Sequence, residues 1–363
     1  MNVDARVEAW ASLQISGIAP RPLAELLGAF GSAQAVLAAS PAQRRAFVTG
    51  PAGKAMGAAP DRERLARTLA WLAEPEASLV AWDDSDYPRP LLEIGDPPPV
   101  FYCLGRRDLL TRPALAIVGS RNATPQGCTD ASAFAAALSA AGLTIASGLA
   151  LGIDAAAHRG ALDHAGSSIA VVGTGLDRVY PARNRDLAHA LAARGALISE
   201  FAPGTPPLPA NFPRRNRLIS GLARGVLVVE ATLSSGSLIT ARFAGEQGRE
   251  VFALPGSIHS PFSKGCHKLI REGAKLVETA QDILDELRLS MVAPATGAAA
   301  PDDGPPDSMA SALLAALGHS PADVDTLAAR CGLAAAAVIA TLTALELDGR
   351  VAGIPGGNWQ RIG

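Results

Sequence analysis

Short apolar runs alternate with longer mixed segments through the middle of the chain. The runs cover residues 115–118, 143–146, 168–172, 196–199, 226–229 and 251–254. Each run has the length of a buried strand, and the segments between them are long enough to form a helix. Buried parallel strands read as continuous apolar runs because helices cover both faces of their sheet. The pattern therefore predicts an α/β fold with a doubly wound parallel sheet.

The residues before these runs follow a helical pattern. Apolar side chains recur on one helix face at Leu23, Leu26, Leu27 and Phe30. Gly31 then ends the pattern as a helix stop signal. The segment ISGIAP at 15–20 is similar to the hairpin of a helix-hairpin-helix module, although Ala19 replaces its second glycine. We predict a small helical domain over residues 1–78, and a strand-and-turn segment at 79–110 that leads into the sheet.

The last part of the chain follows a stretch rich in Pro, Ala and Gly, which predicts a linker at 289–307 between the sheet domain (79–288) and a final domain. Residues 308–363 show three helical patterns and then a hairpin, an order that suggests a winged helix. Its third helix, 334–349, contains no cation and no amide side chain. Base edges in the major groove are read by such side chains, so we predict a packing or protein-contact role for this helix.

Composition limits the class of protein. The chain has 363 residues, of which 48% are hydrophobic and 18% are charged, as in a globular protein with more than one domain. The formal net charge of −2 excludes a globally basic, histone-like binder, but a local anion site remains open.

Cysteine spacing and the N-terminus bear on location. The four cysteines are widely spaced, which predicts reduced thiols and no metal site. The N-terminus is charged and has no apolar core of a signal peptide. Residues 131–153 carry no charge, but Gly142 and the run that follows indicate a helix and a strand of the buried core. We therefore predict a cytoplasmic protein without a membrane span.

Small residues and cations directly follow the predicted strands. In a parallel sheet, ligands bind outside the carboxyl ends of the strands, and glycines together with free N–H groups at helix starts accept anions there. The candidates are Gly119, Ser120, Arg121, Gly148, Gly173, Ser235, Gly236, Ser237 and Lys264. Several such loops on one edge of the sheet predict a row of anion-binding backbone.

The stretch NFPRRNR at 211–217 places three arginines within four positions. Its candidates are Phe212, Arg214, Arg215, Asn216 and Arg217, and a second connection adds Arg183. Arginine suits phosphate because its planar fork is always charged, and Phe212 and Tyr180 offer aromatic faces on which a base can stack. Together these features predict a groove that binds single-stranded DNA whatever its base sequence.

Catalytic motifs are missing from the sequence, so we predict no enzyme activity and no cofactor. Asp154 and His158 share one helix face, and we interpret them as a helix-start carboxylate and a surface histidine rather than a catalytic pair. The alternative is a nucleotide-binding enzyme or sensor that uses the same strand-end loops, with Glu230 as its acid or base. A transcription regulator that uses the winged helix is disfavoured by the Ala-rich third helix.

Blocks of sequence across the middle of the chain resemble the DprA/Smf family. They include AIVGSR (116–121), SGLALGIDAAAHRGAL (147–162), VVGTGLDRVYPARNRDL (171–187), ISEFAPGTPPLPANFPRRNRLISGL (198–222), VVEATLSSGSLITARFAGEQGREVFALPG (228–256) and LIREGAKLV (269–277). The resemblance implies a Rossmann-like domain flanked by a SAM-like helical domain and a DML1-like winged helix. It also implies a non-enzymatic protein of natural transformation that protects incoming single-stranded DNA, loads the recombinase RecA and forms a homodimer through the Rossmann-like domain.

The resemblance also implies roles for particular residues. The arginine of the family's GSR block falls on Arg121, and its FPxRNR block falls on residues 212–217. Arg183 represents the basic residue after the YP block, and residues 235–240 resemble the loop on the phosphate side. His267 stands where the family often carries Asn.

Overall fold

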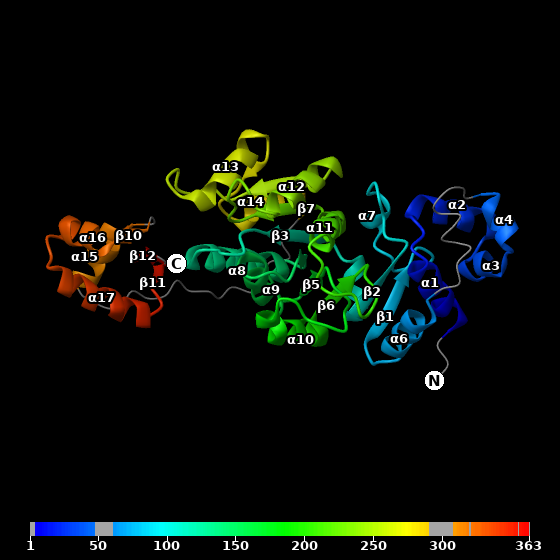
Figure 1. The fold of residues 1–363 in the computed structure, drawn as a ribbon. Coiled ribbons are helices and arrows are strands. Elements are labelled where there is room, and N and C mark those ends of the chain that lie inside the picture. Colours follow the sequence, from blue (N-terminus) through cyan, green and yellow to red (C-terminus); the bar gives the residue numbers. More distant parts are fainter. Residues whose placement is uncertain (1–3, 48–60, 290–307, 319–320, 355, 363) are drawn as a thin grey trace.

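The computed structural model describes residues 4–47, 61–289, 308–318, 321–354 and 356–362. Figure 1 shows a helical part, a central sheet flanked by helices, and a small C-terminal part in chain order. The predicted linker at 289–307 lies outside the described residues except for its first residue. The predicted boundary between residues 78 and 79 falls within the first strand of the sheet, β1 (Ala77–Ala81).

The N-terminal part is helical. Its helices are α1 (Ala5–Ile15), α2 (Pro20–Phe30), α3 (Ala33–Ala38), α4 (Pro41–Arg45) and α6 (Arg62–Leu72). Helix α2 ends at Gly31, whose φ of 82° places it in the left-handed conformation that glycine adopts readily, as the sequence predicted. Gln14 of α1 donates to the carbonyl of Glu200 and accepts from the hydroxyl of Tyr102, so this part is hydrogen-bonded to the sheet.

The central sheet has nine strands in the order β1-β2-β6-β5-β4-β3-β7-β8-β9. The strands after β1 are β2 (Val100–Gly105), β3 (Ala114–Val118), β4 (Thr144–Ser147), β5 (Ser168–Val171), β6 (Ala196–Ser199), β7 (Gly225–Val228), β8 (Glu250–Ala253) and β9 (Lys275–Leu276). Strands β3 to β9 pair in parallel, which confirms the predicted α/β fold class. The strand-and-turn segment supplies β1 and β2 at this end of the sheet: β2 pairs antiparallel with β6, and β1 pairs antiparallel with β2.

Strand β3 marks the point where the order of the strands reverses, because it pairs with β4 on one side and with β7 on the other. The helices that follow β3, β4 and β5 are α8 (Pro125–Ala140), α9 (Ile153–Ala161) and α10 (Arg185–Arg194). After β6 the chain returns through α11 (Asn211–Leu222) to β7 and continues through α12 (Ser237–Glu246) and α13 (Lys264–Arg271). Such a switch point leaves a crevice at the carboxyl ends of the strands.

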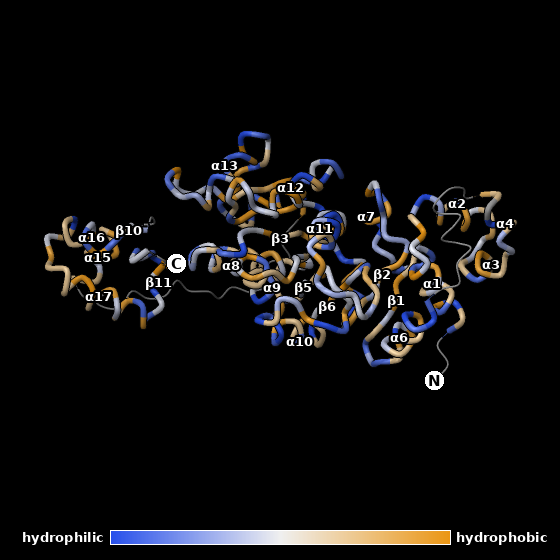
Figure 2. Tube along the Cα trace, in the orientation of Figure 1, coloured by the Kyte–Doolittle hydropathy of each residue, from blue (hydrophilic) through white to orange (hydrophobic). Residues whose placement is uncertain are grey.

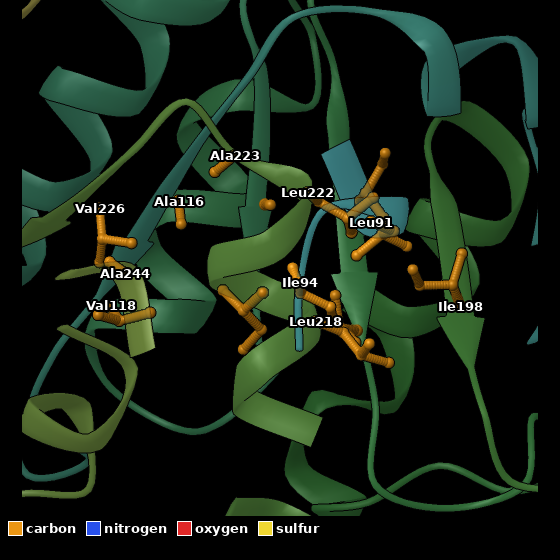
Figure 3. Packing of buried hydrophobic residues seen from close by; sticks show 14 of the residues in the cluster. Leu91, Ile94, Ala116, Val118, Ile198, Leu218, Leu222, Ala223, Val226 and Ala244 are labelled. Carbon is orange, nitrogen blue, oxygen red and sulfur yellow. The ribbon is translucent and has the colours of Figure 1, made fainter. Parts of the chain in front are cut away.

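Alternate residues of β3 enter two different cores. Leu115 and Ile117 belong to the cluster that contains side chains of α8 and α9, whereas Ala116 and Val118 belong to the cluster of α11 and α12. Figure 3 shows Leu218 and Leu222 of α11 among the side chains of this second cluster. The apolar half of α11 therefore fixes the helix on the sheet, while its first turns are hydrophilic (Figure 2).

Residues 131–153 form part of α8, strand β4 and the loop after it, which confirms the prediction of a buried core. In the part of the chain that the structure describes, no single helix has the length and apolar character to cross a membrane. The two helices Val324–Cys331 and Ala335–Leu347 reach that length and apolar character only when taken together, and the angle between them is 108°.

The C-terminal part contains α15 (Ser308–Leu317), α16 (Val324–Cys331), α17 (Ala335–Leu347) and a three-stranded sheet in the order β10-β12-β11. The strands are β10 (Ala322–Asp323), β11 (Val351–Ile354) and β12 (Asn358–Arg361). The predicted helices and hairpin of the winged helix are thus present. Helix α17 exposes Ile339 and Leu347, and its role stays a prediction.

Candidate functional site

A cavity of about 390 Å³ lies at the carboxyl ends of β3 and β7, at the switch point of the sheet. Three segments provide most of its wall: the loop after β3, helix α11 and the loop after β7. The sequence-predicted residues that line it are Gly119, Ser120, Arg121, Arg215, Asn216, Ser235, Gly236 and Ser237. The structure thus brings Arg121 and part of the arginine stretch into one site, as the sequence predicted.

The arginine stretch forms the first turns of helix α11. Successive residues of a helix are about 100° apart. Phe212, Arg215 and Asn216 therefore share one face, and Arg214 and Arg217 share the opposite face. Only the first face meets the cavity, so helix geometry divides the three arginines between two environments.

Arg215 is a buried cation at the wall of the cavity, with an exposure of 4%. Burial lowers the pKa of its guanidinium to about 10, although the nearby carboxylate of Asp154 opposes this shift. Among the described residues, Arg215 has no salt bridge within 4 Å, and its buried Nε has no hydrogen-bond partner. A buried guanidinium without a bonded anion favours the binding of one from outside.

The loop after β4 supports Arg215 from below. The carboxylate of Asp154 accepts hydrogen bonds from the N–H groups of Gly148 (3.1 Å) and Ala150 (3.3 Å). The side-chain amide of Asn184 donates to the carbonyl of Leu149 at 2.9 Å, and Leu149 has a φ of 59°. These bonds hold Gly148 directly against the guanidinium: a Cβ atom there would lie 1.7 Å from Nη1 of Arg215.

We expect Gly148→Ala to displace the guanidinium of Arg215, because the added methyl group overlaps Nη1. For the single-stranded DNA groove that the sequence predicts, the affinity for an oligonucleotide should fall about tenfold, as for the loss of one hydrogen bond to a charged group. Fluorescence anisotropy with labelled oligo-dT measures this change. Gly28→Ala is the matched control because a Cβ at Gly28 has no neighbour within 4 Å, and an equal loss in both variants would contradict the prediction.

In the loop after β3, the backbone of Gly119 packs closely against Ile153 of α9. A Cβ on Gly119 would lie 2.6 Å from Cγ1 of Ile153, so only glycine fits without a shift. The hydroxyl of Thr124 accepts from the N–H of Gly127 at 3.0 Å and so caps the start of α8. Arg121 is exposed beside this turn and, within the described part of the chain, makes no ion pair.

The loop after β7 presents the start of α12 to the cavity. The hydroxyls of Ser235 and Ser237 lie 2.7 Å apart, and Gly236 provides no side-chain cap for the helix. The N–H groups of Ser237, Leu238 and Ile239 at the start of α12 are already hydrogen-bonded, to the Ser235 hydroxyl and to the carbonyls of Ser235 and Gly236. The loop thus adds the two serine hydroxyls and the positive end of the helix dipole to the two arginines.

Glu230 holds two loops together. Its carboxylate accepts from the backbone N–H of Thr124 at 2.9 Å and from the Thr124 hydroxyl at 2.7 Å, and burial raises its pKa. It does not line the cavity. The enzyme hypothesis requires Glu230 to face the cavity as an acid or base. In the structure its carboxylate is instead hydrogen-bonded to Thr124.

Gly173 and Arg183 do not line the cavity, and Gly173 packs against Phe212. The rings of Phe212 and Tyr180 are 5.5 Å apart and tilted by 43°, and a Cβ on Gly173 would lie 3.1 Å from the Phe212 ring. Arg183 is exposed three residues after Tyr180. Phe212 lies on the same face of α11 as Arg215, about one helical turn away, and Tyr180 packs against it from the loop after β5.

Arg214 and Arg217 meet Glu200 instead of the cavity. The side chain of Arg217 is 8% exposed and pairs with the buried carboxylate of Glu200, and its Nη1 donates to the carbonyl of Asp96. Arg214 is 57% exposed and contacts the same carboxylate at 2.8 Å. Glu200 directly follows the apolar run at 196–199. The rule that functional residues follow the carboxyl ends of parallel strands could therefore have identified it from the sequence. Lys264 starts α13 and donates to the carbonyl of Ile258, also away from the cavity.

His158 is fully buried, so its interpretation as a surface histidine was wrong. The reason is packing: α9 lies flat on the sheet, and Nδ1 of His158 reaches the hydroxyl of Ser168 at 2.7 Å. Burial lowers the pKa of His158 to about 3, and the charge of Arg215 adds to this effect. The histidine is thus neutral at physiological pH and lies beneath the site.

The depressed pKa of His158 predicts acid sensitivity. The unfolded chain takes up a proton near pH 6.5 and the folded one only near pH 3, so stability present above pH 6.5 is lost as the pH falls towards 3. We expect a loss of about 2 kcal/mol between pH 6.5 and 5 in the wild type that His158→Gln does not show. Urea unfolding at the two pH values measures it. Identical pH dependence in the two proteins would contradict the assignment.

No group of three or more His, Cys, Asp or Glu side chains in the described residues could hold a metal ion. Cys103, Cys128, Cys266 and Cys331 are all free thiols.

Comparison with known proteins places these features in a family. The family model described as DNA recombination-mediator protein A matches residues 78–288, and the one described as DprA winged helix domain matches residues 297–357. Protein Smf of Escherichia coli is 45% identical over 301 residues, covering 82% of this chain and 80% of that protein. DNA processing protein DprA of Streptococcus pneumoniae is 50% identical over 203 residues, covering 56% of this chain and 72% of that protein.

Two solved structures share the fold. The X-ray structure of DNA processing protein A from Streptococcus pneumoniae superposes with a TM-score of 0.68 and 37% identity, over 79% of this chain and 99% of that one. The protein from Helicobacter pylori, whose structure describes its single-stranded DNA binding mode, superposes with a TM-score of 0.53 and 30% identity. That match covers 59% of this chain and 96% of the Helicobacter chain.

Proposed function

The chain belongs to the DprA/Smf family of DNA recombination-mediator proteins, and from this premise we propose that it binds single-stranded DNA without sequence preference. The observation that carries the proposal is the buried Arg215, which faces one cavity together with Arg121 and the start of α12. All three are suited to phosphate oxygens, which every nucleotide carries. The aromatic pair of Phe212 and Tyr180 adds ring faces that stack on any base.

In this proposal Arg217 keeps α11 in place and does not bind phosphate. Its guanidinium is buried against Glu200, whereas a phosphate contact needs an accessible fork. Arg214 stays a proposed phosphate contact outside the cavity because more than half of its side chain is exposed. Gly148 positions Arg215, and Gly173 lies beneath the aromatic pair.

The finer parts of the proposal follow the family. The protein protects incoming single-stranded DNA, loads RecA onto it during natural transformation, and acts in the cytoplasm as a homodimer through the Rossmann-like domain, without catalysis or cofactor. A strand-exchange assay with RecA and a competing single-strand binding protein tests the loading step. Stimulation by the wild type but not by a variant that no longer binds DNA is the expected result.

We expect Arg121→Ala to weaken binding equally for all base compositions, since a phosphate contact carries no sequence information. The slope of log K against log salt should become smaller by about 0.7, as for one neutralised phosphate on a single strand. Titration of fluorescent oligo-dT and oligo-dC at several salt concentrations measures both quantities.

The control is Arg194→Ala, which removes an exposed arginine at the end of α10, just before the amino end of β6 and thus at the opposite edge of the sheet. It should leave the salt slope unchanged. An unchanged slope in Arg121→Ala would exclude this arginine from the phosphate contacts.

A second candidate function is the binding of a mononucleotide by an enzyme or sensor, which the cavity volume of about 390 Å³ favours because it is typical of a small-molecule site. Thermal shifts with oligo-dT and with mononucleotides distinguish the two, together with an assay for released base. A larger shift with a mononucleotide than with oligo-dT would support this second function.

A further inference from the structure

A second cavity, of about 440 Å³, lies between α10 and the loop that follows β5. Its floor is apolar and consists of the buried side chains Leu149, Val172, Leu176 and Leu197. All four belong to one hydrophobic cluster, so the floor is fixed by packing rather than formed by mobile side chains. Of the residues that the sequence suggests for DNA binding, Tyr180 alone lines this cavity.

The rim of the cavity is polar and mostly basic. Arg178, Arg185 and His189 are exposed at its edge, and the one acidic neighbour, Asp177, faces Arg178 at 3.9 Å. An apolar floor inside a cationic rim suits a flat ring that is attached to phosphate. The floor side chains carry no hydrogen-bonding group, so they would accept any base without reading its edge.

Tyr180 connects this cavity to the phosphate site. Its ring is 49% exposed, lines the cavity and contacts the ring of Phe212. Phe212 precedes Arg215 by about one helical turn, or roughly 5 Å along the helix axis. On the other side, Leu149 of the floor directly follows Gly148, which packs against the Arg215 guanidinium.

We propose that the second cavity takes one unstacked base of the single-stranded DNA whose neighbouring phosphate is bound by Arg215. This inference rests on the proposed function. The base lies on the apolar floor with Tyr180 at its edge, while the rim cations face the adjacent phosphates. Burial of the ring adds affinity that depends on the presence of a base but not on its identity.

The experiment compares binding of oligo-dT with binding of an abasic oligonucleotide of equal length. Ala192 lines the cavity on α10, so Ala192→Phe places a ring where the base would lie. Ala193 is the next residue and is exposed, which makes Ala193→Phe the matched control. Circular dichroism and the urea midpoint establish that both variants are folded.

We expect the preference for oligo-dT over the abasic strand to fall at least fivefold in Ala192→Phe, within the range measured for base stacking on proteins. The salt slope should not change, because the phosphate contacts remain. Ala193→Phe should behave as the wild type. An unchanged preference in folded Ala192→Phe would overturn the inference.

Photocrosslinking of the wild type with an oligonucleotide that contains 5-iodo-deoxyuridine is a test that needs no variant. Crosslinks to residues 176–192 are expected. Crosslinks confined to the loops after β3 and β7 would overturn the base site but leave the proposed function standing. Absence of any binding to oligo-dT would instead refute the proposed function itself.

Discussion

An Arg215→Met variant is expected to bind single-stranded DNA about 30- to 1,000-fold more weakly than the wild type. The guanidinium is buried, and among the described residues it has no bonded anion, so its contact with phosphate would be made in a desolvated site. Loss of one partner from such a charge pair costs about 2–4 kcal/mol. Fluorescence anisotropy with oligo-dT at constant salt measures the change.

Stability should respond differently from binding. The free energy of unfolding of Arg215→Met should stay within about 2 kcal/mol of the wild type. The desolvation cost of the guanidinium disappears, and the buried Asp154 carboxylate loses the attraction of Arg215 but keeps its hydrogen bonds from the N–H groups of Gly148 and Ala150. Arg215→Lys serves as the control for charge without the planar fork, and we expect an intermediate affinity. Wild-type affinity in folded Arg215→Met would remove this residue from the interface.

Arg217→Ala is expected to lose about 3–5 kcal/mol of folding free energy. The substitution leaves the buried carboxylate of Glu200 without its main partner, and an uncompensated buried charge is costly. Burial already raises the pKa of Glu200 against the influence of Arg217. Urea unfolding at neutral pH measures the loss, and the affinity for oligo-dT of the fraction that remains folded should change less than about twofold.

Two further variants test the origin of that loss. Arg214→Ala removes the exposed partner of the same carboxylate and should cost less than about 1 kcal/mol. Arg217→Met combined with Glu200→Leu replaces the pair by apolar side chains and should recover most of the stability. If Arg217→Ala unfolds like the wild type and yet loses DNA binding, our division of the arginines is wrong.

The strands and the edge of the sheet that carries the site could be predicted from the sequence. Six apolar runs became β3 to β8, because a buried strand needs a continuous apolar segment and this requirement is local. The rule that ligands bind at the carboxyl ends of strands then selected Gly119 to Arg121 and Ser235 to Ser237, which line one cavity.

The environment of His158 could not be predicted in the same way. Its sequence neighbours on α9 are compatible with an exposed or a buried position. The structure buries it because that face of α9 packs on the sheet, where it meets Ser168 of β5. Glu230 likewise follows a strand, but its contact with Thr124 depends on how α8 begins beside β7.

The sequence alone determined that three arginines stand together at residues 214–217 and that the loops after β3 and β7 lie at one edge of a parallel sheet. Only the tertiary structure decided that Arg215 faces the cavity while Arg217 is buried against Glu200. The stretch is a helix, so adjacent residues point in directions about 100° apart. The element that meets each direction comes from a distant part of the chain. The hydrophobic pattern of a helix or strand depends on neighbouring residues, so it can be read from the sequence. The partner of a charged side chain depends on which distant segments of the chain pack around it.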